Sequence, residues 1–247
     1  MTGTLYLLPV PLGVTDPADV LPAPVLTVAR QTRYVLAENA RTARAFLKSV
    51  GHPGPIQQIR VVEIGHAPQP AQAIEWLAPL RSGQTDAALV SECGCPGIAD
   101  PGAAVVACAY DLGLLVRPLV GPSSVCLALM ASGMNGQCFR FHGYLPQEAG
   151  ALADSLRCLE RDAAGGETQI FIETPYRTER LFQAILVHCG ESTRLALALD
   201  LGSASEMTIT RRIGQWRALP VAERPALHRR PAVFLLHRDD GASSRRQ

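Results

Sequence analysis

Residues 87–102 read AALVSECGCPGIADPG, and this stretch decides the fold class. Residues 87–91 form a short apolar run bounded by turn-forming residues, which predicts a buried strand. Residues 92–102 contain three Gly and two Pro, which predicts a loop. A helical pattern follows over residues 103–112. A strand, a Gly/Pro-rich loop and a helix in this order predict one unit of a parallel α/β sheet.

The same alternation extends through the first half of the chain. It predicts strands at 4–10, 34–37, 60–64, 87–91 and 114–120, and helices at 25–31, 41–50, 72–80 and 103–112. In the second half, strands follow one another with fewer helices between them, which predicts a mixed sheet. The expected strands there are 138–144, 169–173, 195–201, 207–212 and 232–237, and the expected helices are 124–130, 152–161 and 177–189. We therefore expect an N-terminal α/β domain over 1–118, a C-terminal α/β domain over 119–238, a ligand cleft between them and a polar tail over 239–247.

Composition excludes several classes of protein. Of the 247 residues, 47% are hydrophobic and 18% are charged, so the chain can bury a large core and is not disordered. The net charge of +1 does not suit a protein that binds free nucleic acid through a broad basic surface. Its longest apolar runs are far shorter than the roughly 20 residues that span a bilayer, and no secretory signal is visible.

Familiar cofactor and metal motifs are missing from the sequence. It has neither the G-x-G-x-x-G motif of dinucleotide sites nor the G-x-x-x-x-G-K-[ST] motif of nucleotide-phosphate sites. Cys93 and Cys95 lack the spacing of a zinc site, and we expect no bound metal. Most of the seven cysteines, among them Cys108, Cys126, Cys138, Cys158 and Cys189, lie in apolar runs. This pattern is typical of reduced, buried thiols in a cytoplasmic protein.

The remaining features that suggest chemistry are loops at the ends of predicted strands. They read PVPLG, AENAR, SECGCPGIADPG and GPSS, after the first, second, fourth and fifth strands. In an open parallel sheet, ligands bind beyond the carboxyl ends of the strands, so we expect these loops to form one site. Asn39 and Asp100 have simpler interpretations as helix caps. The two His residues in or near these regions, His66 and His142, are expected to be surface or hydrogen-bonded residues.

Six separated segments resemble the ribosomal RNA small subunit methyltransferase I family of the tetrapyrrole methylase superfamily. They cover nearly the whole chain in the family's order: GTLYLLPVPLG (3–13), AENAR (37–41), ALVSECGCPGIADPG (88–102), RPLVGPSSVCLALMASG (117–133), FHGYLP (141–146) and IFIETPYR (170–177). The resemblance implies a homodimeric methyltransferase that uses S-adenosyl-L-methionine and methylates a ribose 2′-hydroxyl of small-subunit rRNA. It also implies that the cofactor lies in the cleft between the two domains.

The resemblance implies two sets of site residues. The cofactor-binding set is Pro11, Glu92, Gly94, Cys95, Ile98, Ser123, Ser124, Pro175 and Tyr176. The catalytic set, which would act on the acceptor, is Glu38, Arg41 and Glu173. Structural roles remain open for two of these carboxylates: Glu38 could pair with Arg41 or Arg44, and Glu173 could orient Arg177.

Departures from the family pattern lie mainly on the substrate side. The family's AEDTR is AENAR here, so Asn39 and Ala40 replace a carboxylate and a hydroxyl. Two alternatives therefore stay open: a methyltransferase of the same superfamily that acts on a small molecule, and a protein that binds S-adenosylmethionine without turnover. Residues 211–246 hold nine Arg against three acidic residues, a local excess that could contact rRNA phosphates or the small subunit.

Overall fold

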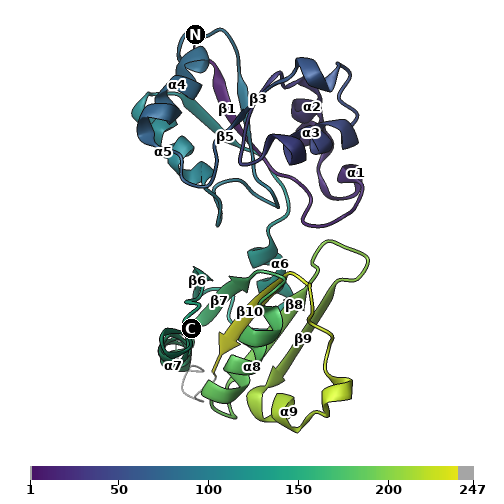
Figure 1. Cartoon of the computed structure of the whole chain (residues 1–247), viewed down its shortest axis with the longest axis vertical. Coiled ribbons are helices and arrows are strands. Elements are labelled where there is room, and N and C mark those ends of the chain that lie inside the picture. Colours follow the sequence, from purple (N-terminus) through teal and green to yellow (C-terminus); the bar gives the residue numbers. More distant parts are fainter. Residues whose placement is uncertain (1, 239–247) are drawn as a thin grey trace. The chain divides into compact units, whose positions relative to one another are not determined.

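The computed structural model describes residues 2–238 and divides the chain into two compact units, Met1–Ser123 and Ser124–Gln247 (Figure 1). The boundary that we predicted from the sequence, between residues 118 and 119, precedes this division by five residues. The predicted polar tail, 239–247, lies outside the described residues, as do two of the nine Arg in the basic region 211–246.

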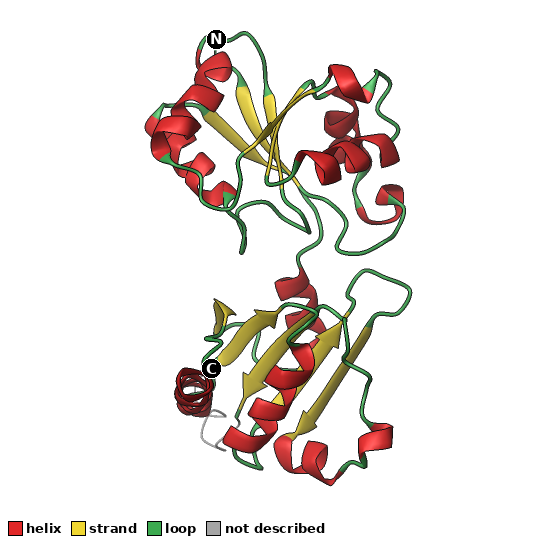
Figure 2. Ribbon diagram, in the orientation of Figure 1, coloured by secondary structure: helices red, strands yellow, loops and turns green. Residues whose placement is uncertain are grey.

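The N-terminal unit contains a five-stranded parallel sheet, as predicted (Figure 2). Its strand order is β3-β2-β4-β1-β5, and every neighbouring pair is parallel. The strands are β1 (Thr4–Leu8), β2 (Tyr34–Ala37), β3 (Arg60–Glu63), β4 (Ala87–Val90) and β5 (Leu115–Pro118). The helices are α1 (Pro17–Val20), α2 (Ala23–Gln31), α3 (Ala40–Ser49), α4 (Pro70–Arg81) and α5 (Gly102–Asp111), with a 3-10 turn η1 (Ile56–Gln58).

Helices cover both faces of this sheet (Figure 1). Successive strand residues point to opposite faces, so a strand buried on both sides needs apolar residues throughout. Leu8 and Val35 pack with α2 and α3 on one face, whereas Leu5 and Leu36 pack with α4 and α5 on the other. All four side chains are fully buried. The short, continuous apolar runs in the sequence reflect this two-sided burial.

The C-terminal unit contains a mixed five-stranded sheet, which confirms the second predicted fold class. Its order is β6-β7-β10-β8-β9; β6 and β7 are parallel and the other pairs are antiparallel. The strands are β6 (Phe139–Tyr144), β7 (Thr168–Glu173), β8 (Arg194–Leu199), β9 (Met207–Arg212) and β10 (Ala232–His237). The helices are α6 (Ser124–Ser132), α7 (Ala149–Ala164), α8 (Thr178–His188) and α9 (Ile213–Ala218), with a 3-10 turn η2 (Val221–Glu223).

Aromatic side chains anchor the core of the C-terminal unit beneath α7, α8 and α9. Trp216 is fully buried and meets Phe182 edge to face, with ring centroids 5.3 Å apart. The indole N–H of Trp216 donates to the Leu195 carbonyl at 3.2 Å, so its one polar group is satisfied. Helix α6 packs on the opposite face of the sheet. Both faces of this sheet therefore carry buried apolar layers.

The prediction that the cysteines are buried is wrong for three of the five that we named. Cys108 and Cys189 are buried, whereas Cys126, Cys138 and Cys158 are exposed. Cys126 and Cys158 lie on outward faces of their helices, and Cys138 immediately precedes β6. An apolar neighbourhood in sequence does not determine which side of a helix faces the core. Among residues 2–238, no helix has both the length and the apolarity needed to cross a bilayer.

Candidate functional site

The loops after β1, β4 and β5 are held together at the carboxyl edge of the N-terminal sheet. The Val10 N–H donates to the Gly94 carbonyl at 3.0 Å, which joins the loops after β1 and β4. The Cys93 thiol donates to the Leu12 carbonyl at 3.3 Å. The loop after β4 also contacts the loop after β5, because the Cys95 thiol donates to the Pro122 carbonyl at 3.3 Å. Three of the loops singled out in the sequence therefore form one continuous surface.

Two glycines shape the loop after β4 in different ways. Gly94 has φ +73°, and a Cβ there would lie 2.9 Å from Leu12 Cδ2 and 3.0 Å from the Pro122 carbonyl oxygen. Gly94 is thus required by the packing of the three loops themselves. Gly97 has φ +81° and nothing within 4 Å of an added Cβ. Its open face allows a ligand to approach the backbone closely.

Asp100 closes the same loop. Its Oδ1 accepts from the backbone N–H groups of Gly97, at 3.0 Å, and Gly102, at 2.8 Å. Gly102 is the first residue of α5, so the carboxylate satisfies a donor at the start of this helix, close to the capping role considered from the sequence. The intervening residue Ala99 adopts a left-handed φ of 53°, a conformation uncommon for residues with a side chain.

A second group of polar contacts extends the site to the loops after β2 and β3. Asn39 caps α3, as predicted, and accepts from the Arg41 N–H at 2.8 Å. Glu63, at the end of β3, accepts from the Ala40 N–H at 2.8 Å. The amino end of α3 is therefore capped by two side chains from neighbouring strand ends.

Glu92 and Glu38 each gain a partner from a different loop. The Thr42 hydroxyl donates to Glu92 Oε1 at 2.5 Å. Glu38 Oε1 lies 2.6 Å from Nδ1 of His66, which follows β3. Glu38 thus contacts neither of the arginines that we considered as structural partners. The His66 contact was missed in the sequence because nothing local marks the side chain that another strand end brings beside Glu38.

The other predicted site residues of the N-terminal unit lie on the same loops. Arg41 is exposed in the first turn of α3, and Pro11 is half-buried after β1. Ile98 is 48% exposed although it is a large apolar residue, and Val14 is fully exposed on the loop after β1. Exposed aliphatic side chains and the exposed Glu92 carboxylate therefore occur on loops at the same edge of the sheet, and small-ligand sites combine apolar and polar groups in this way.

Thiol chemistry is disfavoured at Cys93. Partial desolvation raises the pKa of the Cys93 thiol, and the neighbouring Glu92 carboxylate raises it further. The reactive thiolate form is thereby suppressed. Within the described range 2–238, no group of three or more His, Cys, Asp or Glu side chains is arranged to hold a metal ion.

In the C-terminal unit, Glu173 is engaged by its own neighbours. Its side chain is only 2% exposed and forms an ion pair with Arg177. The Arg177 Nε donates to Glu173 Oε2 at 2.9 Å, and the Thr174 N–H donates to Oε1 at 2.6 Å. Both carboxylate oxygens therefore have partners, which favours the structural alternative for Glu173.

The other residues predicted to contact the cofactor, three in the C-terminal unit and Ser123, differ in exposure. Ser124 begins α6 and is half-buried, as is Pro175. Tyr176, in the turn before α8, is 81% exposed. Ser123, the last residue of the N-terminal unit, is half-buried.

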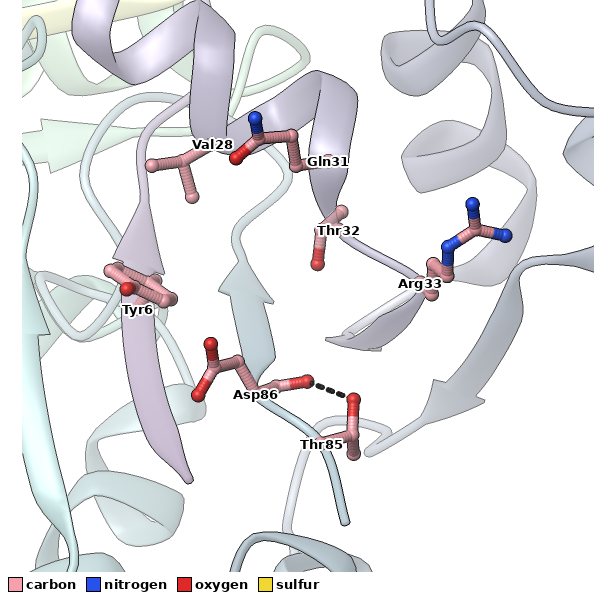
Figure 3. A pocket seen from close by; sticks show the side chains of 7 residues that line it. All are labelled: Tyr6, Val28, Gln31, Thr32, Arg33, Thr85 and Asp86. Atoms are coloured by element: carbon pink, nitrogen blue, oxygen red, sulfur yellow. Dashed lines mark hydrogen bonds between the residues drawn. The ribbon is translucent and has the colours of Figure 1, made fainter. Parts of the chain in front are cut away.

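A distinct cavity lies at the opposite edge of the N-terminal sheet (Figure 3). Its volume is about 190 Å³, and it is lined by Tyr6, Val28, Gln31, Thr32, Arg33, Thr85 and Asp86. Thr32 and Arg33 precede β2, and Thr85 and Asp86 precede β4, so the cavity lies by the amino ends of these strands. None of the predicted site residues lines it.

Comparison of the whole fold with solved structures defines the class of protein. The methyltransferase CobJ matches with a TM-score of 0.60 at 15% identity, over 100% of this chain and 96% of that one. The cobalt precorrin-4 methyltransferase CbiF matches with a TM-score of 0.55 at 14% identity, over 95% and 94% of the two chains. Uroporphyrin-III C-methyltransferase from Thermus thermophilus, solved with S-adenosyl homocysteine, gives 0.53 at 18% identity, over 95% and 97%. The chain has the tetrapyrrole methylase fold.

Sequence comparison identifies the family within that class. No family model matches the chain. Proteins named ribosomal RNA small subunit methyltransferase I are 30% identical over 221 residues in Pseudomonas aeruginosa and 32% identical over 215 residues in Mesorhizobium japonicum. These matches cover 90% and 87% of this chain, and 71% and 68% of the relatives. The chain belongs to the ribosomal RNA small subunit methyltransferase I family, which confirms the resemblance seen in its motifs.

The relatives are longer than this chain. A relative from Micromonospora olivasterospora is 31% identical over 88% of this chain, but the match covers only 65% of the relative. The same share, 65%, holds for the relative from Escherichia coli O157:H7. The chain thus spans about two thirds of the length of the curated relatives that it matches.

Proposed function

We propose that this protein is an S-adenosyl-L-methionine-dependent methyltransferase that methylates small-subunit rRNA at a ribose 2′-hydroxyl. The observation that carries the proposal is the carboxyl edge of the parallel sheet, where hydrogen bonds and one ion pair link the loops that follow all five strands, and Glu92 is exposed among them. Ligand sites in open parallel sheets form at this edge. Membership of the family supports the choice of chemistry and of rRNA as substrate.

The residues at this edge fit such a cofactor. An exposed carboxylate at Glu92 can accept charge-assisted hydrogen bonds from an ammonium group or from ribose hydroxyls. The open face of Gly97 allows the ligand to approach the backbone, and Ile98 offers apolar contact. When bound, the cofactor supplies an electrophilic methyl group on a sulfonium sulfur. The protein's own contribution is to hold the acceptor oxygen in line with that methyl group and to remove the hydroxyl proton.

The remaining assignments from the family resemblance stay predictions. Pro11, Gly94, Cys95 and Ser123 would complete the cofactor site on the N-terminal unit, and Ser124, Pro175 and Tyr176 would contribute from the C-terminal unit. Replacement of the exposed Tyr176 by Ala tests the second group without removing a buried side chain. The expected homodimer is tested by the mass measured in sedimentation velocity.

Transfer of labelled methyl groups tests the function directly. Purified protein is incubated with labelled cofactor and small ribosomal subunits from a strain that lacks the gene. We expect incorporation into rRNA, and nuclease mapping should place the label at a ribose that resists alkaline cleavage. Absence of incorporation into these subunits would overturn the rRNA proposal.

A matched pair of variants tests the cofactor site. Glu92→Gln removes the negative charge, which we expect to weaken cofactor binding by roughly 10- to 100-fold, because a hydrogen bond to a charged group contributes about 1.5–3 kcal/mol. Glu75→Gln makes the same change at an exposed position on α4 of the same unit and should leave the affinity unchanged. Calorimetric dissociation constants compare the two. Equal affinities would place the cofactor elsewhere.

A small-molecule acceptor is the second candidate function. It is favoured by the first turn of α3, where Asn39 is occupied as a helix cap and Ala40 has no polar side-chain atom. Both positions are polar in the family pattern. Labelled product in an RNA-free metabolite extract, with none in ribosomal subunits, would support this candidate. Cofactor binding without turnover on either pool would instead indicate a protein that only binds the cofactor.

A further inference from the structure

His66 and Glu38 form a pair at the ends of adjacent strands. Glu38 follows β2 directly, and His66 lies in the loop after β3; the two strands are neighbours in the sheet. Nδ1 of His66 lies 2.6 Å from Oε1 of Glu38. The Glu38 side chain is 17% exposed and the His66 side chain is 90% exposed. The carboxylate thus lies deeper and the imidazole projects into the solvent.

The geometry assigns the two ring nitrogens different roles. In the neutral imidazole one nitrogen carries a proton and the other has a lone pair. A carboxylate beside Nδ1 favours the tautomer in which Nδ1 carries the proton and donates it to Glu38. Nε2 then presents its lone pair on the exposed side of the ring. A carboxylate that orients a histidine in this way is a recurring arrangement for removing a proton from a hydroxyl.

Neighbouring polar groups do not compete for this role. Glu63, at the end of β3, uses Oε1 to accept from the Ala40 N–H. Asn39 is committed to the cap of α3 and, as an amide, is not a base. Glu38 itself is less accessible than the ring and has one oxygen already paired. A substrate hydroxyl that approaches this edge would reach the imidazole before the carboxylate.

We propose that His66 is the general base of the methyl transfer and that Glu38 is its positioning residue. This proposal rests on the proposed function, because it assigns the proton acceptor for the same reaction. As the acceptor oxygen forms its bond to the methyl carbon, the carbon–sulfur bond breaks and its electron pair remains on sulfur. The hydroxyl proton moves to Nε2 of His66, and Glu38 stabilises the resulting imidazolium. The proton then passes to water, which restores the neutral ring.

Removal of the ring gives the first test. In His66→Ala we expect kcat on small subunits to fall about 100-fold or more, the usual range for loss of a general base, with the cofactor dissociation constant within twofold of wild type. The variant should remain folded, because the ring that is removed is 90% exposed and a pair with so exposed a partner contributes only about 0–1 kcal/mol. His228→Ala removes another exposed imidazole, in the C-terminal unit, and should keep the wild-type kcat.

Chemical rescue separates catalysis from a structural role. Because the His66 side chain is 90% exposed, the space that it vacates is open to solvent. Added imidazole should therefore raise the kcat of His66→Ala at least tenfold. It should have no effect on the wild type or on His228→Ala. Residues that only stabilise the loop are not replaced by free imidazole. A His66→Ala enzyme with wild-type kcat, or one that imidazole does not rescue, would overturn the proposal.

The positioning role of Glu38 is tested by non-additivity. Glu38→Gln should lower kcat with little change in KM, and Glu38→Asp should recover part of the loss. In the His66→Ala background, Glu38→Gln should cause no further loss, because the group that it orients is gone. Additive losses would refute the positioning role. A wild-type enzyme without any methyl transfer would refute the proposed function itself, whereas an active wild type with an equally active His66→Ala variant refutes only the base.

Discussion

Gly121, in the loop after β5, packs directly against Pro9, in the loop after β1. A Cβ added at Gly121 would lie 2.2 Å from Pro9 Cγ and 2.3 Å from Pro9 Cβ. Carbon atoms make favourable contact at about 3.5–4.0 Å, so an alanine at position 121 lacks more than 1 Å of space. The backbone of Gly121 does not have a positive φ, so this effect is steric and not conformational. The Pro9 ring cannot rotate away as a long flexible side chain could.

We expect Gly121→Ala to lower the free energy of unfolding of the N-terminal unit by about 1–3 kcal/mol, the usual cost of overpacking. The added methyl group should displace Pro9, and this displacement should reach the candidate cofactor site. Pro9 precedes Val10, whose N–H donates to the Gly94 carbonyl. We therefore expect cofactor affinity to fall about tenfold, which corresponds to about 1.4 kcal/mol.

Hydrogen exchange followed by peptide mass spectrometry is the appropriate assay, because it reports the two units separately. Gly54→Ala is the matched control: it lies in the same unit, and its added Cβ would meet only a histidine ring at 3.4 Å, an ordinary contact. The control should change stability by no more than about 0.5 kcal/mol. If Gly121→Ala and Gly54→Ala have the same stability and the same affinity, the argument that close packing of these two loops supports the site is wrong.

Three other predictions concern buried or paired polar groups. Glu173→Gln should lower the free energy of unfolding by about 1–3 kcal/mol, since the buried Glu173 carboxylate pairs with Arg177. Urea denaturation of the wild type and the variant tests this, and unchanged stability would contradict a stabilising ion pair. Burial raises the pKa of the Cys189 thiol to about 12, so the unfolded thiol ionises first and stability should fall by about 1.4 kcal/mol per pH unit between about pH 9 and 12. Cys189→Ala should remove this contribution and so reduce the slope of stability against pH, whereas Cys158→Ala, at an exposed position, should keep the wild-type slope; equal slopes in urea titrations would disprove the assignment. Asp200, in the turn between β8 and β9, pairs with Arg230, which precedes β10. Asp200→Asn should weaken this pair and lower the free energy of unfolding by about 1–2 kcal/mol, detected as a lower urea midpoint; an unchanged midpoint would show that the pair contributes nothing.

Secondary structure was predictable here because its determinants are local. The buried strands β2 and β4 are continuous apolar runs, and α8 carries its buried Leu181, Phe182 and Ile185 at helical spacing. The short helices α1 and α9 were not predicted. They have four and six residues, too few to display a helical period in the sequence.

The candidate site was predicted only in part. Asn39 was identified as a cap because a cap lies beside the helix that it serves. Glu38 was identified as a candidate catalytic residue, and the structural alternative considered for it, a pair with Arg41 or Arg44, is replaced in the structure by a contact with His66. The interaction with His66 depends on β2 and β3 being neighbours, and residue types in a single sequence do not reveal that pairing.

The sequence by itself determined the class of this protein. Alternating apolar runs and Gly/Pro-rich loops determined a parallel sheet followed by a mixed one, and six motif segments determined the family. Tertiary structure alone decided which side chains meet. The strand order β3-β2-β4-β1-β5 brings Thr42 to Glu92, 50 residues away, and His66 to Glu38. Periodicity and turn chemistry act over a few residues, whereas a site at the edge of a sheet is assembled by strand pairing over the whole unit.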